Sequence, residues 1–157
     1  MLREYGIVMD DGTTTRVSEN HYHMTTTTAQ AANVLSHLEY YLQIVWPELN
    51  VNVVSTTEQW AGAAIAGPKS RDLLQKLFPE TDCSNDGLPF MGFIETKLFG
   101  VYARIFRISF SGELAYEVNV ESDNGNFMWE KIIELGEEFK IQPYGTCLLY
   151  TSDAADD

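Results

Sequence analysis

The sequence predicts an α+β fold in which one layer of helices packs on a mostly antiparallel sheet. Short segments with two-residue alternation of apolar and polar side chains are separated by tight, glycine-containing turns, as in antiparallel strands. Three longer segments carry apolar residues at helical spacing. The chain of 157 residues is 45% hydrophobic and 21% charged, which is ordinary for one domain with a real core.

The first part of the chain is expected to form strands around one long helix. Thr27 or Thr28 is a suitable N-cap for a helix over residues 29–46, because a side-chain hydroxyl can accept from the first free backbone N–H groups. Pro47 ends that helix, since proline cannot continue the hydrogen-bond ladder. Strands are predicted in this part at residues 6–9, 13–17, 20–26, 51–56 and 59–66.

The second part is expected to combine two helices with a three-stranded meander. A helix opens at Pro68, where proline suits the first helical position, and runs to about Phe78. A further helix is capped by Asp123 or Asn124 and reaches Phe139. The meander strands are predicted at residues 93–98, 101–110 and 114–120.

Charge and cysteine content limit the function classes. The formal net charge of −13 argues against an electrostatic grip on nucleic acid or on an anionic membrane. No apolar run approaches the roughly 18 residues of a membrane span, and no signal-peptide pattern opens the chain. Cys83 and Cys147 do not form a disulfide framework, so a cytoplasmic location with no metal is expected.

The last eleven residues, "CLLYTSDAADD", are treated separately. They resemble the translation of a sequencing-library adapter, and a segment of that kind is excluded from fold reasoning. We therefore expect a domain over residues 1–146, as a fragment truncated at its C-terminal end, and a non-native tail over residues 147–157.

Two polar clusters have competing interpretations. Asp10 and Asp11 precede Gly12 in a turn, where aspartate commonly bonds nearby backbone N–H groups, and this structural interpretation is favoured from the residues alone. Adjacent residues point in opposite directions, so at most one of the pair is expected to enter a pocket. His21 and His23 have a spacing that suits two metal ligands, but no third ligand is evident, and an exposed strand face is favoured.

The stretch "SGELAYEVNV" contains the most informative carboxylate, Glu117. Alternation along a strand places it on the face opposite Tyr116. A carboxylate offers two parallel acceptors that match a guanidinium, or the 2-amino group and ring N–H of a pterin or guanine. From spacing alone, a cross-strand ion pair with Arg104 or Arg107 is the favoured interpretation.

Five stretches together resemble one family: "GIVMDDGTTTRV", "HYHMTTTTAQAANVL", "TEQWAGAAIAGPKSRDLL", "FRISFSGELAYEVNV" and "PYGT". They are similar to the aminomethyltransferase-like folate-binding region of heterotetrameric sarcosine oxidase alpha subunits. The wider superfamily includes the T-protein of the glycine cleavage system. The "MTTTT" and "TEQWA" segments resemble sarcosine oxidase in particular.

The resemblance implies roles for individual residues. Glu117 occupies the position that holds the pterin ring in the superfamily. Asp11, with Asp10 as the alternative, occupies the position beside the reacting folate nitrogens. Tyr22, Phe110 and Tyr116 are the candidate aromatic partners of the pterin.

The resemblance also implies a ligand, cofactors and partners. Tetrahydrofolate would accept the one-carbon unit of oxidised sarcosine and become methylene-tetrahydrofolate. FAD, FMN and NAD are expected in the full complex with the beta, gamma and delta subunits, but not on this fragment, which is not expected to oxidise sarcosine alone. The alternatives are a T-protein-like aminomethyltransferase and a folate-binding module without transfer chemistry.

Overall fold

The computed structural model describes residues 1–145, and the chain divides into two compact units, Met1–Trp60 and Ala61–Asp157. The predicted α+β class is confirmed, with three α-helices and antiparallel strands in the described part. The strands form two sheets, of two and four strands, where one sheet was predicted. The predicted tail over residues 147–157 lies outside the described residues. No helix in residues 1–145 is long and apolar enough to cross a membrane.

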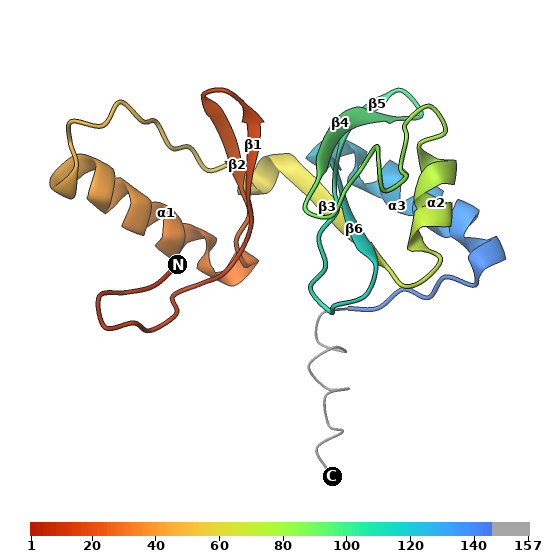
Figure 1. Cartoon of the computed structure of the whole chain (residues 1–157), viewed down its shortest axis with the longest axis horizontal. Coiled ribbons are helices and arrows are strands. Elements are labelled where there is room, and N and C mark those ends of the chain that lie inside the picture. The colour runs from red at the N-terminus through yellow and green to blue at the C-terminus, as the bar shows by residue number, and fades with distance from the viewer. Residues whose placement is uncertain (146–157) are drawn as a thin grey trace, which may run out of the picture. The chain divides into compact units, whose positions relative to one another are not determined.

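The first unit combines a β-hairpin with one helix (Figure 1). Strands β1 (Thr14–Ser18) and β2 (His21–Met24) pair antiparallel. Helix α1 (Ala31–Tyr40) follows a 3-10 turn, Thr28–Gln30, and continues as one π-helical turn, Tyr41–Val45, which ends two residues before Pro47. The predicted helix over residues 29–46 is therefore confirmed in its extent.

Two of the predicted strands in this unit are wrong. Residues 6–9 contribute only an isolated bridge between Leu2 and Val8, and residues 51–56 form no strand. Val54 is 78% exposed. Valine favours strands mainly through packing on neighbouring strands, so a valine-rich run without a strand beside it remains irregular.

The second unit is built on a four-stranded sheet in the order β3-β6-β5-β4. Its strands are β3 (Trp60–Ala66), β4 (Phe93–Leu98), β5 (Val101–Phe106) and β6 (Ala115–Glu121). Both β4–β5 and β5–β6 pair antiparallel. The backbone N–H of Gly67 donates to the carbonyl of Leu114, and Gly62 lies against Asn119. Because the later of the two glycines lies beside the earlier of their two partners, these contacts show that β3 is also antiparallel to β6.

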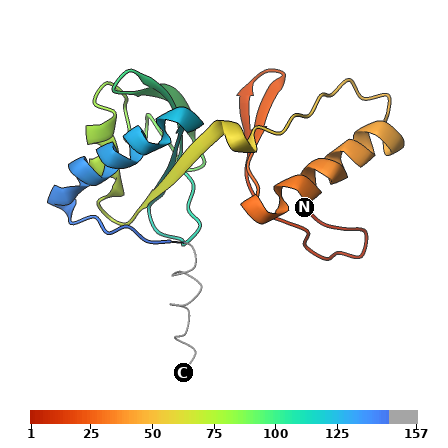
Figure 2. The ribbon, with the colours of Figure 1, turned by 180° about the vertical axis from the view of Figure 1, so that it is seen from behind.

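Two helices cover one face of this sheet, α2 (Ser70–Leu77) and α3 (Gly125–Gly136) (Figures 1 and 2). They enclose a core that holds nearly all of the buried apolar side chains in the described residues, whereas the first unit contributes only Val34. The most deeply buried members are Leu74, Leu77, Phe78, Cys83, Leu88, Leu98, Ala103, Ile105, Tyr116, Val118 and Val120. Among the described residues of this unit, no helix lies on the opposite face of the sheet.

Strand β5 ends earlier than predicted, at Phe106 rather than at residue 110. Beyond it, the Arg107 guanidinium donates to Oδ1 of Asn85 at 2.8 Å and to the carbonyl of Leu88 at 3.0 Å. Arg71 donates to the same Asn85 oxygen at 2.7 Å. Arg71 therefore fastens the loop between α2 and β4 to α2, and Arg107 fastens the same loop to the residue that follows β5.

The turn between β4 and β5 requires an unusual backbone conformation. Phe99 and Gly100 both have positive φ, 46° and 92°, and Leu98 pairs with Val101 across them. A two-residue hairpin turn of this hand follows the natural twist of the strands, and glycine adopts it without steric cost.

Gly100→Ala is expected to lower the free energy of unfolding by about 1–2 kcal/mol, because the added Cβ penalises the left-handed conformation. Chemical unfolding followed by circular dichroism measures the loss. Gly145→Ala is the matched control, since Gly145 has no positive φ and, among residues 1–145, no neighbour within 4 Å of the added atom. Equal effects of the two substitutions would contradict the role given to the turn.

Candidate functional site

Strand β6 presents its carboxylate on the face of the sheet opposite α2 and α3. Tyr116, Val118 and Val120 are each 0% exposed and belong to the core. Because side chains alternate along a strand, Glu117 and Asn119 lie on the opposite face. Burial of the apolar side chains thus fixes the direction in which Glu117 and Asn119 point.

Glu117 sits among apolar groups. Its cross-strand partner is Phe106, which is 1% exposed and packs on Phe93 with ring centroids 5.0 Å apart. The carboxylate is half-buried and makes no hydrogen bond or ion pair within residues 1–145. Desolvation by burial raises the pKa of Glu117 above its ordinary value. The carboxylate of Glu117 is therefore a partly desolvated hydrogen-bond acceptor that has no partner among residues 1–145.

The cross-strand ion pair favoured from spacing is wrong. Arg104 lies opposite Asn119 rather than Glu117, and its guanidinium pairs with Glu95 at 3.3 Å. Arg107 is committed to the loop between α2 and β4. Neither arginine neutralises Glu117, which leaves the ligand-binding interpretation of this carboxylate open.

The two aspartates of the first unit differ sharply. Asp10 is buried, and its carboxylate accepts from the backbone N–H of Thr27 at 3.0 Å and from the Thr27 hydroxyl at 2.9 Å. Asp11 is exposed and makes no hydrogen bond within residues 1–145. Asp10 thus ties the turn to the residues before α1, and Asp11 is the aspartate whose carboxylate is uncommitted.

The three candidate aromatic residues occupy different environments. Tyr116 is fully buried, with the Arg71 guanidinium 5.9 Å from its ring centroid, and strand alternation places it on the face opposite Glu117. This position argues against the expected stacking of Tyr116 on a ligand held by Glu117. Phe110 is 75% exposed in the loop that leads into β6, and Tyr22 is exposed on β2 in the first unit. Within the second unit, Phe110 is therefore the candidate with an available ring.

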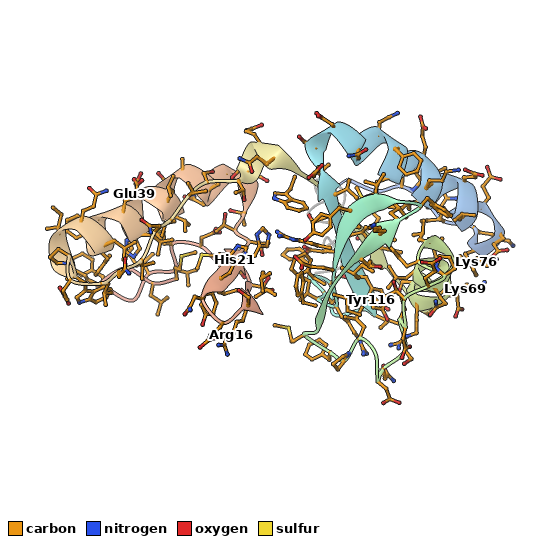
Figure 3. All side chains as sticks on the ribbon, turned by 90° about the horizontal axis from the view of Figure 1, so that it is seen from above. Arg16, His21, Glu39, Lys69, Lys76 and Tyr116 are labelled. Atoms are coloured by element: carbon orange, nitrogen blue, oxygen red, sulfur yellow. The ribbon has the colours of Figure 1, made fainter. Side chains whose placement is uncertain are left out.

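Other reactive side chains have structural explanations. His21 is exposed on the hairpin (Figure 3), and His23 contacts Trp60 edge-on at 6.3 Å. No group of three metal-ligating side chains occurs in residues 1–145. Burial raises the pKa of the Cys83 thiol to about 11, so this thiol is protonated at neutral pH.

The chain is similar to known proteins over nearly its whole length. The family described as the GCVT N-terminal domain matches residues 1–151. Sarcosine oxidase subunit alpha of Rhizobium meliloti is 50% identical over 147 residues, which are 92% of this chain and 15% of that relative. The subunit alpha of Corynebacterium sp. strain P-1 is 50% identical, over 93% of this chain and 15% of its own length. An aminomethyltransferase of Caldanaerobacter subterraneus is 29% identical over 92% of this chain and 37% of its own length. The chain therefore spans about 15% of the length of these sarcosine oxidase relatives.

Glu117→Gln is expected to stabilise the chain at pH 7.5 and to have little effect near pH 4. Burial raises the folded-state pKa above the unfolded-state value, so the folded state loses stability as pH rises between the two values and the carboxylate ionises. The neutral amide avoids that loss. Chemical unfolding of both proteins at the two pH values measures the difference, with the exposed Glu121→Gln as control. A stabilisation independent of pH would contradict the desolvated carboxylate.

Proposed function

This chain belongs to the GCVT N-terminal domain family, and on that premise we propose that it is the folate-binding part of a sarcosine oxidase alpha subunit. The observation that carries the proposal is the half-buried Glu117 carboxylate, which lacks a partner within residues 1–145. The identity of 50% with two sarcosine oxidase alpha subunits supports the oxidase assignment over the T-protein-like one, whose relative is 29% identical.

Glu117 fits the edge of a pterin ring. The 2-amino group and the adjacent ring N–H point in parallel, as the two acceptor oxygens of a carboxylate require. A charge-assisted pair of hydrogen bonds would replace the water that burial has removed from Glu117. The small outward residues of β3 leave space beside it, because Ala64 and Ala66 are exposed methyl groups next to β6.

Asp11 would act on the transfer step rather than on binding. The two nucleophilic nitrogens of tetrahydrofolate would each form a bond to the one-carbon unit and lose a proton, while the bond between that carbon and the amine breaks and the nitrogen of the departing glycine takes up the two protons. An ionised carboxylate beside those nitrogens stabilises the positive charge of the transition state and accepts the proton. Asp11 is assigned this role because Asp10 is already bonded to Thr27.

The oxidation of the amine is assigned to parts outside this chain. FAD, FMN and NAD would serve the assembled enzyme, together with beta, gamma and delta subunits, and we propose a cytoplasmic location. Capture by folate would then compete with hydrolysis of the oxidised amine to formaldehyde. Holding the reactants together favours capture, because effective molarities of aligned groups reach about 10⁵ M or more.

Glu117→Ala is expected to weaken binding of tetrahydrofolate by about 10-fold or more, since hydrogen bonds to a charged group contribute roughly 1.5–3 kcal/mol. Isothermal titration of the chain measures the dissociation constant. Glu121→Ala is the matched control, because Glu121 follows on the same face of β6 and is exposed. Unchanged affinity in Glu117→Ala would remove this residue from the folate site.

Asp11→Asn is expected to slow transfer by roughly 10²–10⁴-fold, the usual range for loss of a general base, while folate binding is retained. The measurement is methylene-tetrahydrofolate formed per formaldehyde released in the assembled oxidase. Asp10→Asn should instead lower stability, because it weakens the contacts with Thr27. Loss of transfer in Asp10→Asn alone would reverse the two roles, and loss in neither would indicate a binding module without transfer chemistry.

A further inference from the structure

Asn119 is the second polar residue on the Glu117 face of β6, and its amide nitrogen is unused. Nδ2 is buried and has no hydrogen-bond partner within residues 1–145. An unpaired buried donor carries a desolvation cost, so such a group in a native structure calls for an explanation. Alternation places Asn119 two residues beyond Glu117 on the same face, at a spacing of about 7 Å for an extended strand.

Neighbouring strands hold this amide in place. Gly62 of β3 lies so close that a Cβ there would be 2.6 Å from Oδ1 of Asn119. On the other side, Arg104 of β5 is the cross-strand partner of Asn119, and that guanidinium is committed to Glu95 and to the Tyr102 hydroxyl. The oxygen end of the amide therefore packs on β3, and the nitrogen end is a fixed donor on the sheet face.

We propose that Asn119 donates from Nδ2 to the 4-oxo group of the pterin ring that Glu117 binds, and so selects 4-oxo over 4-amino pteridines. This inference rests on the proposed function. One edge of a 4-oxo pterin presents, in order, the 2-amino donor, a ring N–H donor and the carbonyl acceptor. A carboxylate followed by an amide nitrogen on one strand face complements that order. A 4-amino ring places a donor against the Asn119 donor, and its adjacent ring nitrogen carries no hydrogen, so the ring loses the Asn119 contact and one of the two Glu117 contacts.

The buried, unpaired amide of Asn119 is expected to lower stability rather than raise it. Removing an unpaired buried amide takes away a desolvation cost, so Asn119→Leu, which keeps the branched arrangement of side-chain heavy atoms, is expected to leave the unfolding temperature unchanged or to raise it. Ligand binding is expected to fall in the same variant. A gain in stability with a loss in binding is the signature of a functional group.

The test measures binding of folic acid and of aminopterin, which carries an amino group in place of the 4-oxo group, to the wild-type chain and to Asn119→Leu. We expect the substitution to weaken folic acid binding by about 3- to 15-fold, the loss of one hydrogen bond, and to leave aminopterin binding unchanged. Thermal unfolding of each variant confirms that the comparison is between folded proteins.

Two controls separate this inference from the proposed function. Glu121→Gln, on the same strand face but exposed, should change neither affinity. Glu117→Gln should weaken folic acid binding. If it does so while Asn119→Leu weakens both ligands equally or neither, the role of Asn119 is overturned and the folate site stands. If the wild-type chain does not bind folic acid, the proposed function fails and this inference fails with it.

Discussion

The alternation of side chains along β6 is the constraint on which both the core and the candidate site depend. Tyr116, Val118 and Val120 are fully buried, and burying each such side chain contributes about 1.5–3 kcal/mol. That gain exceeds the cost of partly desolvating one carboxylate. A strand turned over to expose Glu117 would therefore be less stable, because its apolar face would leave the core. A slip of one residue in register would exchange the two faces and expose the core.

Much of this arrangement follows from the sequence. Two-residue alternation in "LAYEVNV" predicts which face carries Glu117, and the spacing in residues 29–46 predicts the helix and its end near Pro47. These signals are local, and the packing agrees with them. The valine-rich residues 51–56 show where local signals fail, because strand propensity is realised only when a neighbouring strand provides hydrogen bonds and contacts.

The partners of the charged residues could not be read from spacing. The turn at Gly100 places Arg104 opposite Glu95, and the loop before β6 places it opposite Asn119. Arg107 bonds to Asn85, which is 22 residues away. The chain has 23 acidic and 10 basic residues, yet Arg71 and Arg107 donate to loop carbonyls and to an amide oxygen rather than to carboxylates. Only the folded chain shows that Glu117 is left without a cation and that the amide of Asn119 lacks an acceptor.

The uneven distribution of buried apolar side chains has a consequence for motion. Within residues 1–145, Val34 is the one such side chain in the first unit, while the second unit holds the rest. Local opening costs least where few apolar contacts are lost, so backbone amides around α1 and the hairpin should exchange with solvent well before those of β5 and β6. The segment carrying Asp11 would thus be the more yielding half of the chain, and the strand carrying Glu117 the rigid one.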